Sequence, residues 1–164
     1  MREFLFFFIS VMIIFSLIQK STKSYEVETL VSQIDNRRYI VRKRDDSQQA
    51  CDLLAQINKR IEILFSHLRN ISQKREGVDT LLRRYNPDKL SETLQGEKYT
   101  SYSVNKGEQI SLCLRYKDDS FININTIMFV VLHELAHVMT KEEGHTESFW
   151  ANMKYLLEEG EKQK

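Results

Sequence analysis

The stretch FVVLHELAHVMTKEEGH, residues 129–145, decides how the rest of the chain is organised. His133 and His137 stand four positions apart, so on a helix their imidazoles project from one face and can converge on one ion. Glu134 follows the first histidine, where its carboxylate can hold a water on that ion. The chain has four histidines, and His145 is the third within this short window. This is the H-E-x-x-H arrangement of zinc-dependent peptidases.

The residues around the motif predict a buried helix. From Ile127 to Met139 the chain is apolar except at His133, Glu134 and His137, and a helix that is apolar on all sides is a buried one. Burying three such polar groups without partners would cost on the order of several kcal/mol, so something must satisfy them. A zinc ion with its water does so directly, and we therefore expect Zn2+ as the cofactor.

A third ligand is expected from the turn after the helix. Gly144 permits the backbone conformation that swings the chain back, which would bring His145 to the metal. Three neutral imidazoles leave the fourth zinc position for water, the mark of a catalytic site, and Glu134 then acts as general acid/base. The alternative third ligands are the oxygen donors Glu147, Glu158 and Glu159. The candidates for stabilising the oxyanion, among which the sequence does not choose, are Tyr99, Tyr102, Arg115 and Tyr116.

Length and composition favour one compact domain with a sizeable core. The chain has 164 residues and a net charge of +1, so no global field favours nucleic acid or an acidic partner. Two cysteines, Cys51 and Cys113, are too few for a disulfide framework. We expect an N-terminal segment over residues 1–20, a tether over 21–36 and a catalytic domain over 37–164.

The N-terminal segment contains an uncharged apolar run from Phe4 to Ile18. The run is short for a bilayer span of about 20 residues, although the flanking Lys20 could snorkel. No small-residue cleavage site follows, which disfavours a signal peptide, and the run has no polar face, which disfavours a buried helix at a chain terminus; an uncleaved membrane anchor is therefore favoured. Basic residues are denser after the run than before it, so the domain is expected on the cytosolic side, with secretion as the alternative.

The first half of the domain is expected to hold one strand and one long helix. Residues 37–44 have the composition of a strand, and their five basic side chains suit a solvated sheet edge better than phosphate contacts. Asp45 and Gln48 resemble a capping box. Apolar residues then recur at helical spacing to about Asn70, and His67 is interpreted as a surface histidine on that helix.

The second half adds short elements around the motif helix. We expect a short helix over residues 79–85 and a hairpin of strands 99–104 and 109–115. Asn123 or Asn125 caps the motif helix, and Thr146 caps a final helix whose tail frays from Glu158. The packing face of that final helix is Phe149, Trp150, Met153, Leu156 and Leu157. These elements predict an α+β fold in which a small antiparallel sheet packs on the two main helices.

The motif and the residues after it resemble the WLM-type and SprT-like zinc metallopeptidases, and most of all members encoded by large DNA viruses. The resemblance rests on His-Glu-Leu-Ala-His at 133–137, Gly144-His145 and Phe149-Trp150, and it extends over residues 45–157 in the order of elements. It implies a minimal zincin-like domain, with three histidine ligands, Glu134 as general acid/base, and Phe149-Trp150 packed behind the site. It also implies that a substrate peptide adds to the sheet as an antiparallel strand, for which residues 109–115 are the expected partner.

The leading hypothesis is a membrane-anchored zinc endopeptidase acting on protein or peptide substrates. Some members of the family cleave proteins cross-linked to DNA, so a nucleic-acid-associated protease recruited through Arg37 to Arg44 is one alternative. The other is a catalytically inactive, zinc-stabilised binding module. The intact Glu134 argues against inactivity, because only catalysis needs a carboxylate there.

Overall fold

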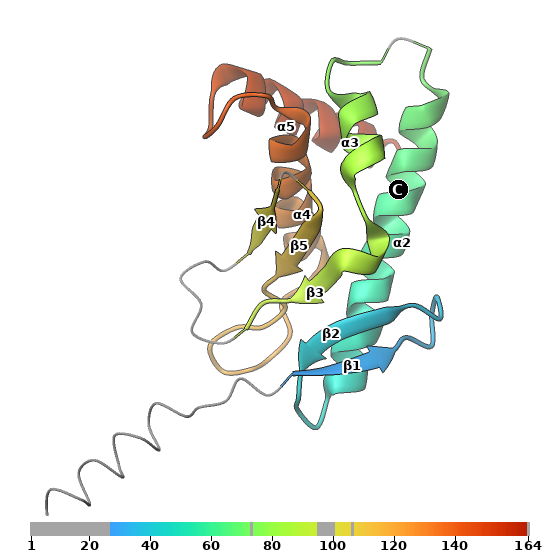
Figure 1. Ribbon diagram of the computed structural model, residues 1–164, viewed down its shortest axis with the longest axis vertical. Coiled ribbons are helices and arrows are strands. Elements are labelled where there is room, and N and C mark those ends of the chain that lie inside the picture. The colour runs from blue at the N-terminus through green and yellow to red at the C-terminus, as the bar shows by residue number, and fades with distance from the viewer. Residues whose placement is uncertain (1–26, 73, 95–100, 106, 164) are drawn as a thin grey trace, which may run out of the picture.

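The computed structural model describes residues 27–72, 74–94, 101–105 and 107–163, and it confirms the α+β class (Figure 1). The helices are α2 (Ser47–Asn70), α3 (Val78–Arg84), the short 3-10 helix η1 (Pro87–Lys89), α4 (Ile124–Met139) and α5 (Glu147–Glu161). The strands are β1 (Val27–Val31), β2 (Arg38–Arg42), β3 (Leu90–Glu92), β4 (Tyr102–Val104) and β5 (Gln109–Leu112). The long helix, the short helix after it, the hairpin and the last two helices all follow the predicted order.

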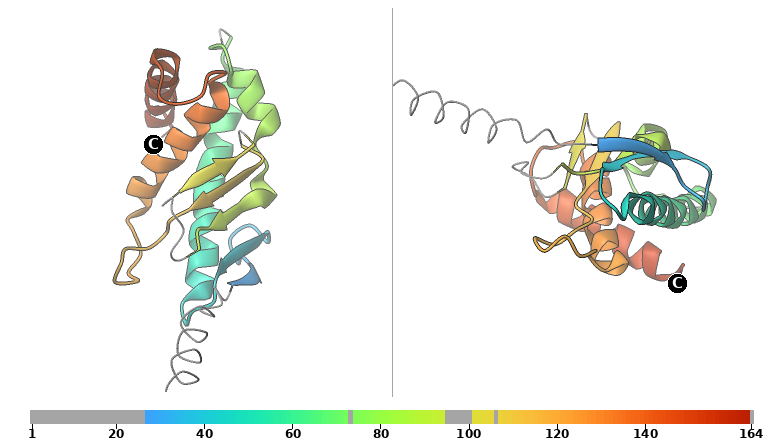
Figure 2. Two further views of the ribbon diagram at one scale, coloured as in Figure 1. Left: turned by 60° about the vertical axis from the view of Figure 1, so that its left-hand side comes forward. Right: turned by 90° about the horizontal axis from the view of Figure 1, so that it is seen from below.

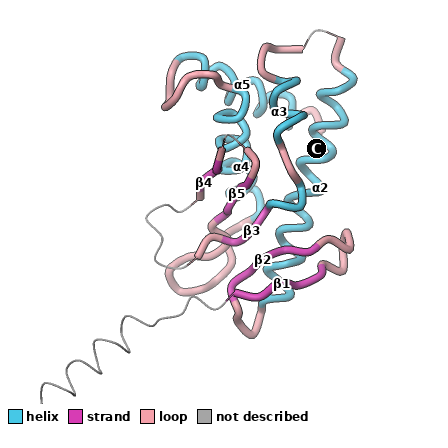
Figure 3. The backbone as a smooth tube through the Cα atoms, viewed as in Figure 1, coloured by secondary structure: helices cyan, strands magenta, loops and turns pink. Residues whose placement is uncertain are grey.

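The sheet has the strand order β1-β2-β3-β5-β4 (Figure 3). It is mixed, so the prediction of an antiparallel sheet is wrong. The hairpins β1/β2 and β4/β5 are antiparallel, but β3 pairs in parallel with both β2 and β5. The connection allows this: α2 and α3 lie between β2 and β3, and parallel neighbours need a crossover of that length. The three-residue strand β3 takes part in both parallel pairs. The sequence analysis assigned no element to its residues.

Two expectations about the start of the domain are corrected. Val27–Val31, placed in a tether by the sequence, is the first strand, and it pairs with β2 along its whole length. β2 lies between β1 and β3, so it is not a sheet edge. Tyr39 and Val41 point into the core from β2 while Ile40 is 47% exposed, which is the alternation of a strand with one buried face. The basic side chains of β2 therefore lie on an inner strand of the sheet, and the prediction that they mark a solvated sheet edge is wrong.

Helix α2 runs along the domain and carries much of the core (Figure 2). It packs against β1, β2 and β3, while α4 packs against β5. The predicted capping box does not form at the start of α2: the N-cap is Asp46, whose side chain makes no cap hydrogen bond. The carboxylate of Asp46 instead binds Arg115, and the side-chain amide of Gln48 donates to Val31 O. These side chains therefore bond to residues far along the chain and do not cap the helix.

The caps of the last two helices match the sequence. The side chain of Asn123, rather than that of Asn125, caps α4 by accepting from the Asn125 N–H, and Thr146 caps α5 by accepting from the Phe149 N–H. α4 is not buried all round, because Phe129 is 55% exposed. α5 continues past Glu158 to Glu161, so the tail does not fray there. Trp150 is 57% exposed, and it does not belong to the packing face of α5.

The apolar run at residues 4–18 lies outside the described residues. Within the part of the chain that the structure describes, no helix combines the length and apolar character that crossing a bilayer requires.

Candidate metal centre

Three imidazoles converge at the C-terminal half of α4. The Nε2 atom of His133 lies 3.2 Å from Nε2 of His137 and 3.1 Å from Nε2 of His145. One ligand nitrogen from each of the three lies within 4.8 Å of the others. Zinc–nitrogen bonds of about 2.0–2.1 Å in a tetrahedron place two ligand nitrogens roughly 3.3 Å apart. The donors and their spacing therefore fit a zinc ion.

The local structure explains this convergence. His133 and His137 are one turn apart on α4, as the motif predicts. Gly144 has φ +83°, in the left-handed region, and it reverses the chain just before His145. Thr146 then begins α5 immediately after the third imidazole. The glycine turn inferred from the sequence is thus the feature that returns His145 to α4.

Phe149 forms the wall behind the three imidazoles. Its ring centroid lies 4.9 Å from that of His133, 4.4 Å from that of His137 and 4.7 Å from that of His145. The side chain is fully buried, so it excludes water from that side and restricts the rotation of all three rings. Trp150 lies beside the centre rather than behind it, with its ring 5.7 Å from His145 and open to solvent.

The electrostatics of the centre suit both the ligands and the carboxylate. Burial, and then the charge of His145, lower the pKa of His133, which favours the neutral form that binds metal. Burial raises the pKa of the Glu134 carboxyl, while hydrogen bonds from the Ser103 hydroxyl and backbone and the charge of His145 oppose that rise. Ser103 lies on β4, so the sheet reaches the carboxylate. No local pattern in the sequence indicated this serine.

The family model for the WLM domain matches residues 32–164. The chain belongs to the WLM family. A protein of Acanthamoeba polyphaga mimivirus is 38% identical over 146 residues, which are 86% of this chain and 74% of that protein. A protein of Invertebrate iridescent virus 6 is 31% identical over 145 residues, covering 87% and 79% of the two chains. The resemblance to members from large DNA viruses is therefore confirmed.

The WLM fold is also found among solved structures. Crystal structures of Wss1 from Saccharomyces cerevisiae and of a Wss1 mutant superpose with TM-scores of 0.54 and 0.55 at 21% and 20% identity. They cover 73% of this chain and 84% and 85% of the Wss1 chains. At that identity the likeness shows a shared fold. Family and fold together place this WLM domain in a family of the metalloprotease type, with a histidine triad that can bind a metal.

The other candidate ligands lie elsewhere in the WLM domain. Among the described residues, the histidine triad is the one group of His, Cys, Asp and Glu side chains arranged to hold a metal, and Glu147, Glu158 and Glu159 are not part of it. Glu159 Oε2 lies 2.7 Å from His67 Nε2 and Glu159 Oε1 lies 2.7 Å from Lys162 Nζ. His67 therefore links α2 to α5, in agreement with its interpretation as a histidine outside the metal site.

The structure excludes one of the four residues that the sequence offered for stabilising the oxyanion. Arg115 is excluded, because its side chain is 1% exposed and its guanidinium binds Glu92 and Asp46. Tyr116 is 54% exposed, and Tyr99 lies outside the described residues. Tyr102 lies half-buried on β4, next to the Ser103 that contacts Glu134. Tyr102 therefore stays a candidate because it neighbours Ser103 in the sequence.

Among the five basic residues at 37–44, Arg37, Arg42 and Arg44 lie near acidic side chains in the WLM domain. Arg37 contacts Asp88 at 2.7 Å and Glu62 at 3.2 Å, and Arg44 lies 3.7 Å from Asp119. These pairs give Arg37 and Arg44 acidic partners within the protein, and the nucleic-acid hypothesis stays a prediction from the sequence.

Proposed function

We propose that this WLM domain is a zinc-dependent endopeptidase. The observation that carries the proposal is the convergence of three imidazole Nε2 atoms beside a buried glutamate on the same helix. His133, His137 and His145 would hold the ion. When bound there, zinc supplies Lewis acidity that polarises a peptide carbonyl and acidifies water.

Glu134 supplies the proton transfer. Glu134 is 8% exposed as a residue, and its carboxylate is held by the Ser103 hydroxyl and backbone, so it cannot rotate freely. It accepts a proton from the attacking water and delivers it to the nitrogen of the leaving amine. The imidazoles, fixed from behind by Phe149, stay in their ligand orientation while the proton moves.

The sheet offers a place for an extended peptide, although not the one expected from the sequence. β5 is paired on one side with β3 and on the other with β4, so residues 109–112 have no open edge. β4 is the terminal strand of the described sheet. A peptide adding antiparallel to β4 would hydrogen-bond to its backbone and pass next to Ser103 and Glu134. A protein or peptide substrate fits this arrangement.

The decisive experiment compares wild type with Glu134→Gln in cleavage of a denatured protein or a peptide library. The substitution keeps the shape and removes the base, so we expect zinc to stay bound stoichiometrically and hydrolysis to fall by about 10²–10⁴-fold. A chelator should abolish wild-type cleavage, and added zinc should restore it. His145→Ala is the matched metal control and should lose zinc.

Two results would overturn the proposal. Cleavage by Glu134→Gln at the wild-type rate would remove the assigned base. Wild-type protein that binds zinc and cleaves nothing would favour the zinc-stabilised binding module instead.

We also propose, from the sequence of residues 4–18, that the chain is anchored in a membrane with its catalytic domain in the cytosol. Carbonate extraction of membranes and protease accessibility of the domain test this. Recovery of a soluble chain shortened at its N-terminus would favour secretion.

A further inference from the structure

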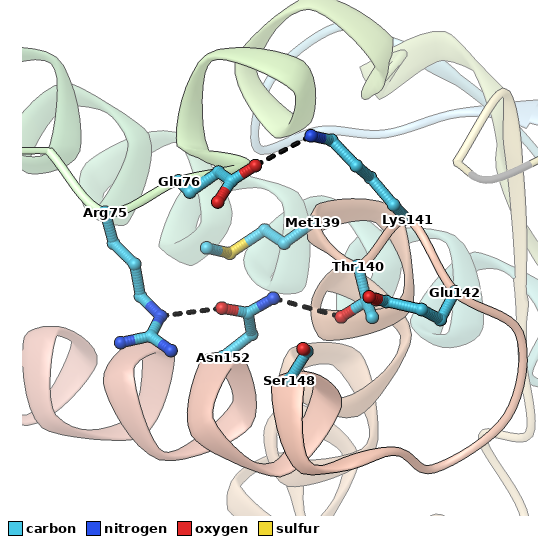
Figure 4. Close-up of a pocket in the computed structure, with 8 residues that line it drawn as sticks. All are labelled: Arg75, Glu76, Met139, Thr140, Lys141, Glu142, Ser148 and Asn152. Atoms are coloured by element: carbon cyan, nitrogen blue, oxygen red, sulfur yellow. Dashed lines mark hydrogen bonds and ion pairs between the residues drawn. The ribbon is translucent and has the colours of Figure 1, made fainter.

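A polar cavity lies directly behind the return turn that carries His145. It has a volume of about 340 Å³ and lies between the end of α4, the start of α5 and the segment before α3 (Figure 4). Three of its lining side chains, Arg75, Thr140 and Asn152, are joined by hydrogen bonds. They come from three different parts of the chain, so the cavity marks a junction of elements.

Asn152 is the centre of this network. Its Oδ1 accepts from Arg75 Nε at 2.7 Å, and its Nδ2 donates to Thr140 Oγ1 at 3.0 Å (Figure 4). The Thr140 hydroxyl in turn donates to Ala136 O at 2.7 Å, inside the last turn of α4. Asn152 is 6% exposed and Thr140 is 2% exposed. Water therefore competes little for the Asn152–Thr140 and Thr140–Ala136 bonds, which are both buried, whereas Arg75 reaches Asn152 from the surface.

Asn152 occupies an apolar position on α5. Phe149, Met153 and Leu156 form the buried stripe of this helix, and Asn152 falls between them at helical spacing. An apolar side chain at that position would pack in the stripe without requiring any partner. A buried amide instead requires α5 to lie where both of its hydrogen bonds can form. It therefore specifies the register of α5 against α4.

This register determines where the third imidazole lies. The loop between α4 and α5 is exposed from Lys141 to His145, so packing within the loop does not hold His145 in place. The loop is tied at one end by Thr140, the C-cap of α4, and at the other by α5. The Thr140–Asn152 bond joins those two ends. Phe149, which contacts all three imidazoles, precedes Asn152 by one turn on the same face.

We propose that Asn152 is a positioning residue for the metal centre. Through Thr140 it holds α5 so that His145 and Phe149 meet the two histidines of α4, while Arg75 keeps the Asn152 amide in the required orientation. The inference rests on the proposed metal centre and adds to it the residues that set its geometry. Groups that orient metal ligands typically change metal affinity by about 10–100-fold when removed.

The test measures zinc affinity by competition with a chromophoric chelator, in the full chain. Asn152→Asp keeps the shape and the acceptor for Arg75 but cannot donate to Thr140. Thr140→Val removes the hydroxyl at nearly constant volume. We expect each to weaken zinc binding by about 10–100-fold and to change the visible spectrum of the Co2+-loaded protein, which reports ligand geometry. Thr140→Ser keeps the hydroxyl and should bind zinc as wild type does.

Two controls separate positioning from general stability. Leu156→Ala removes a fully buried side chain from the same face of α5 and should lower the melting temperature while leaving zinc affinity within about threefold of wild type. Ser148→Ala, which changes the lining of the same cavity, should alter neither quantity.

The outcomes are distinct. Wild-type affinity and spectra in both Asn152→Asp and Thr140→Val would overturn the inference while leaving the metal centre intact. Equal weakening by Leu156→Ala would also overturn it, because affinity would then follow the stability of α5. Absence of zinc binding by wild type would overturn the metal centre and this inference together.

Discussion

The Arg115→Met substitution removes a buried guanidinium while keeping much of the side-chain volume. In the structure Arg115 Nε donates to Glu92 Oε1 at 2.9 Å, and its two terminal nitrogens bind the two oxygens of Asp46 at 2.7 and 2.8 Å. The guanidinium carbon also lies 4.2 Å from the centre of the Phe121 ring. The side chains of Arg115 and Glu92 are 1% and 0% exposed. The substitution therefore leaves a carboxylate in the interior without its main partner.

The expected loss of stability follows from which charge stays buried. Removing one partner of a buried pair costs about 3–5 kcal/mol. Glu92 keeps a hydrogen bond from the Arg42 backbone N–H at 2.8 Å and lies 3.7 Å from Arg42 Nε, which places the loss near the lower end. The side chain of Asp46 is 39% exposed, so water replaces Arg115 there and the further loss is at most about 1 kcal/mol. We expect a total of about 3–4 kcal/mol.

Urea unfolding of metal-free wild type, Arg115→Met, Glu92→Gln and the double variant Glu92→Gln/Arg115→Met measures this loss. The double variant should be more stable than the sum of the single losses predicts, by about 0.5–3 kcal/mol, because the stranded charge has gone. Zinc affinity of folded Arg115→Met should equal that of wild type. A loss under about 1 kcal/mol would refute the reasoning from burial. Lost peptidase activity at unchanged stability would return Arg115 to the oxyanion candidates.

Three further predictions concern the backbone, the metal and pH. Gly77→Ala should lower the free energy of unfolding, measured in thermal melts, by about 2–4 kcal/mol, because φ is +88° and a Cβ would lie 2.3 Å from Met139 O. Gly144→Ala should lower it by only about 1–2 kcal/mol, because φ is +83° but an added Cβ would have no neighbour within 4 Å. Removing zinc with a chelator should destabilise the protein by about 4 kcal/mol relative to zinc at a thousandfold excess over Kd, and a melting temperature independent of zinc would contradict this. The hydrogen bond from Arg115 lowers the pKa of Asp46. This pair therefore stabilises the fold fully above the unfolded pKa of about 3.9, and its effect is lost as pH falls through the lower folded value. Urea titrations at acid and neutral pH should show a smaller acid-induced loss of unfolding free energy in Arg115→Met than in wild type.

Features that depend on neighbours along the chain were predictable. The histidine pair on α4 follows from a spacing of four, and the caps at Asn123 and Thr146 follow from the residue types that accept hydrogen bonds from free N–H groups. The return of His145 follows from the left-handed conformation that glycine tolerates at Gly144. Each of these predictions depends only on a few consecutive residues.

Features that depend on residues far apart in the sequence could not be predicted from local patterns. The capping box at Asp45 and Gln48 does not form because the helix begins one residue later, with Asp46 as its N-cap, and the Gln48 side chain bonds to Val31 O on β1 instead. Asn152 was overlooked because its neighbours Met153 and Leu156 indicated only a packing face, although an amide within an apolar stripe is itself a signal of a buried network.

The sequence by itself determined the family, the order of the main elements and the histidine triad with its glutamate. These depend on short-range geometry, in which one helical turn or one glycine decides which side chains meet. Only the tertiary structure decided that the sheet is mixed, that β4 rather than β5 is its outer strand next to Glu134, and that Arg115 is part of the core. Strand partners and buried ion pairs are selected by packing between segments far apart in the chain, and no local pattern encodes that choice.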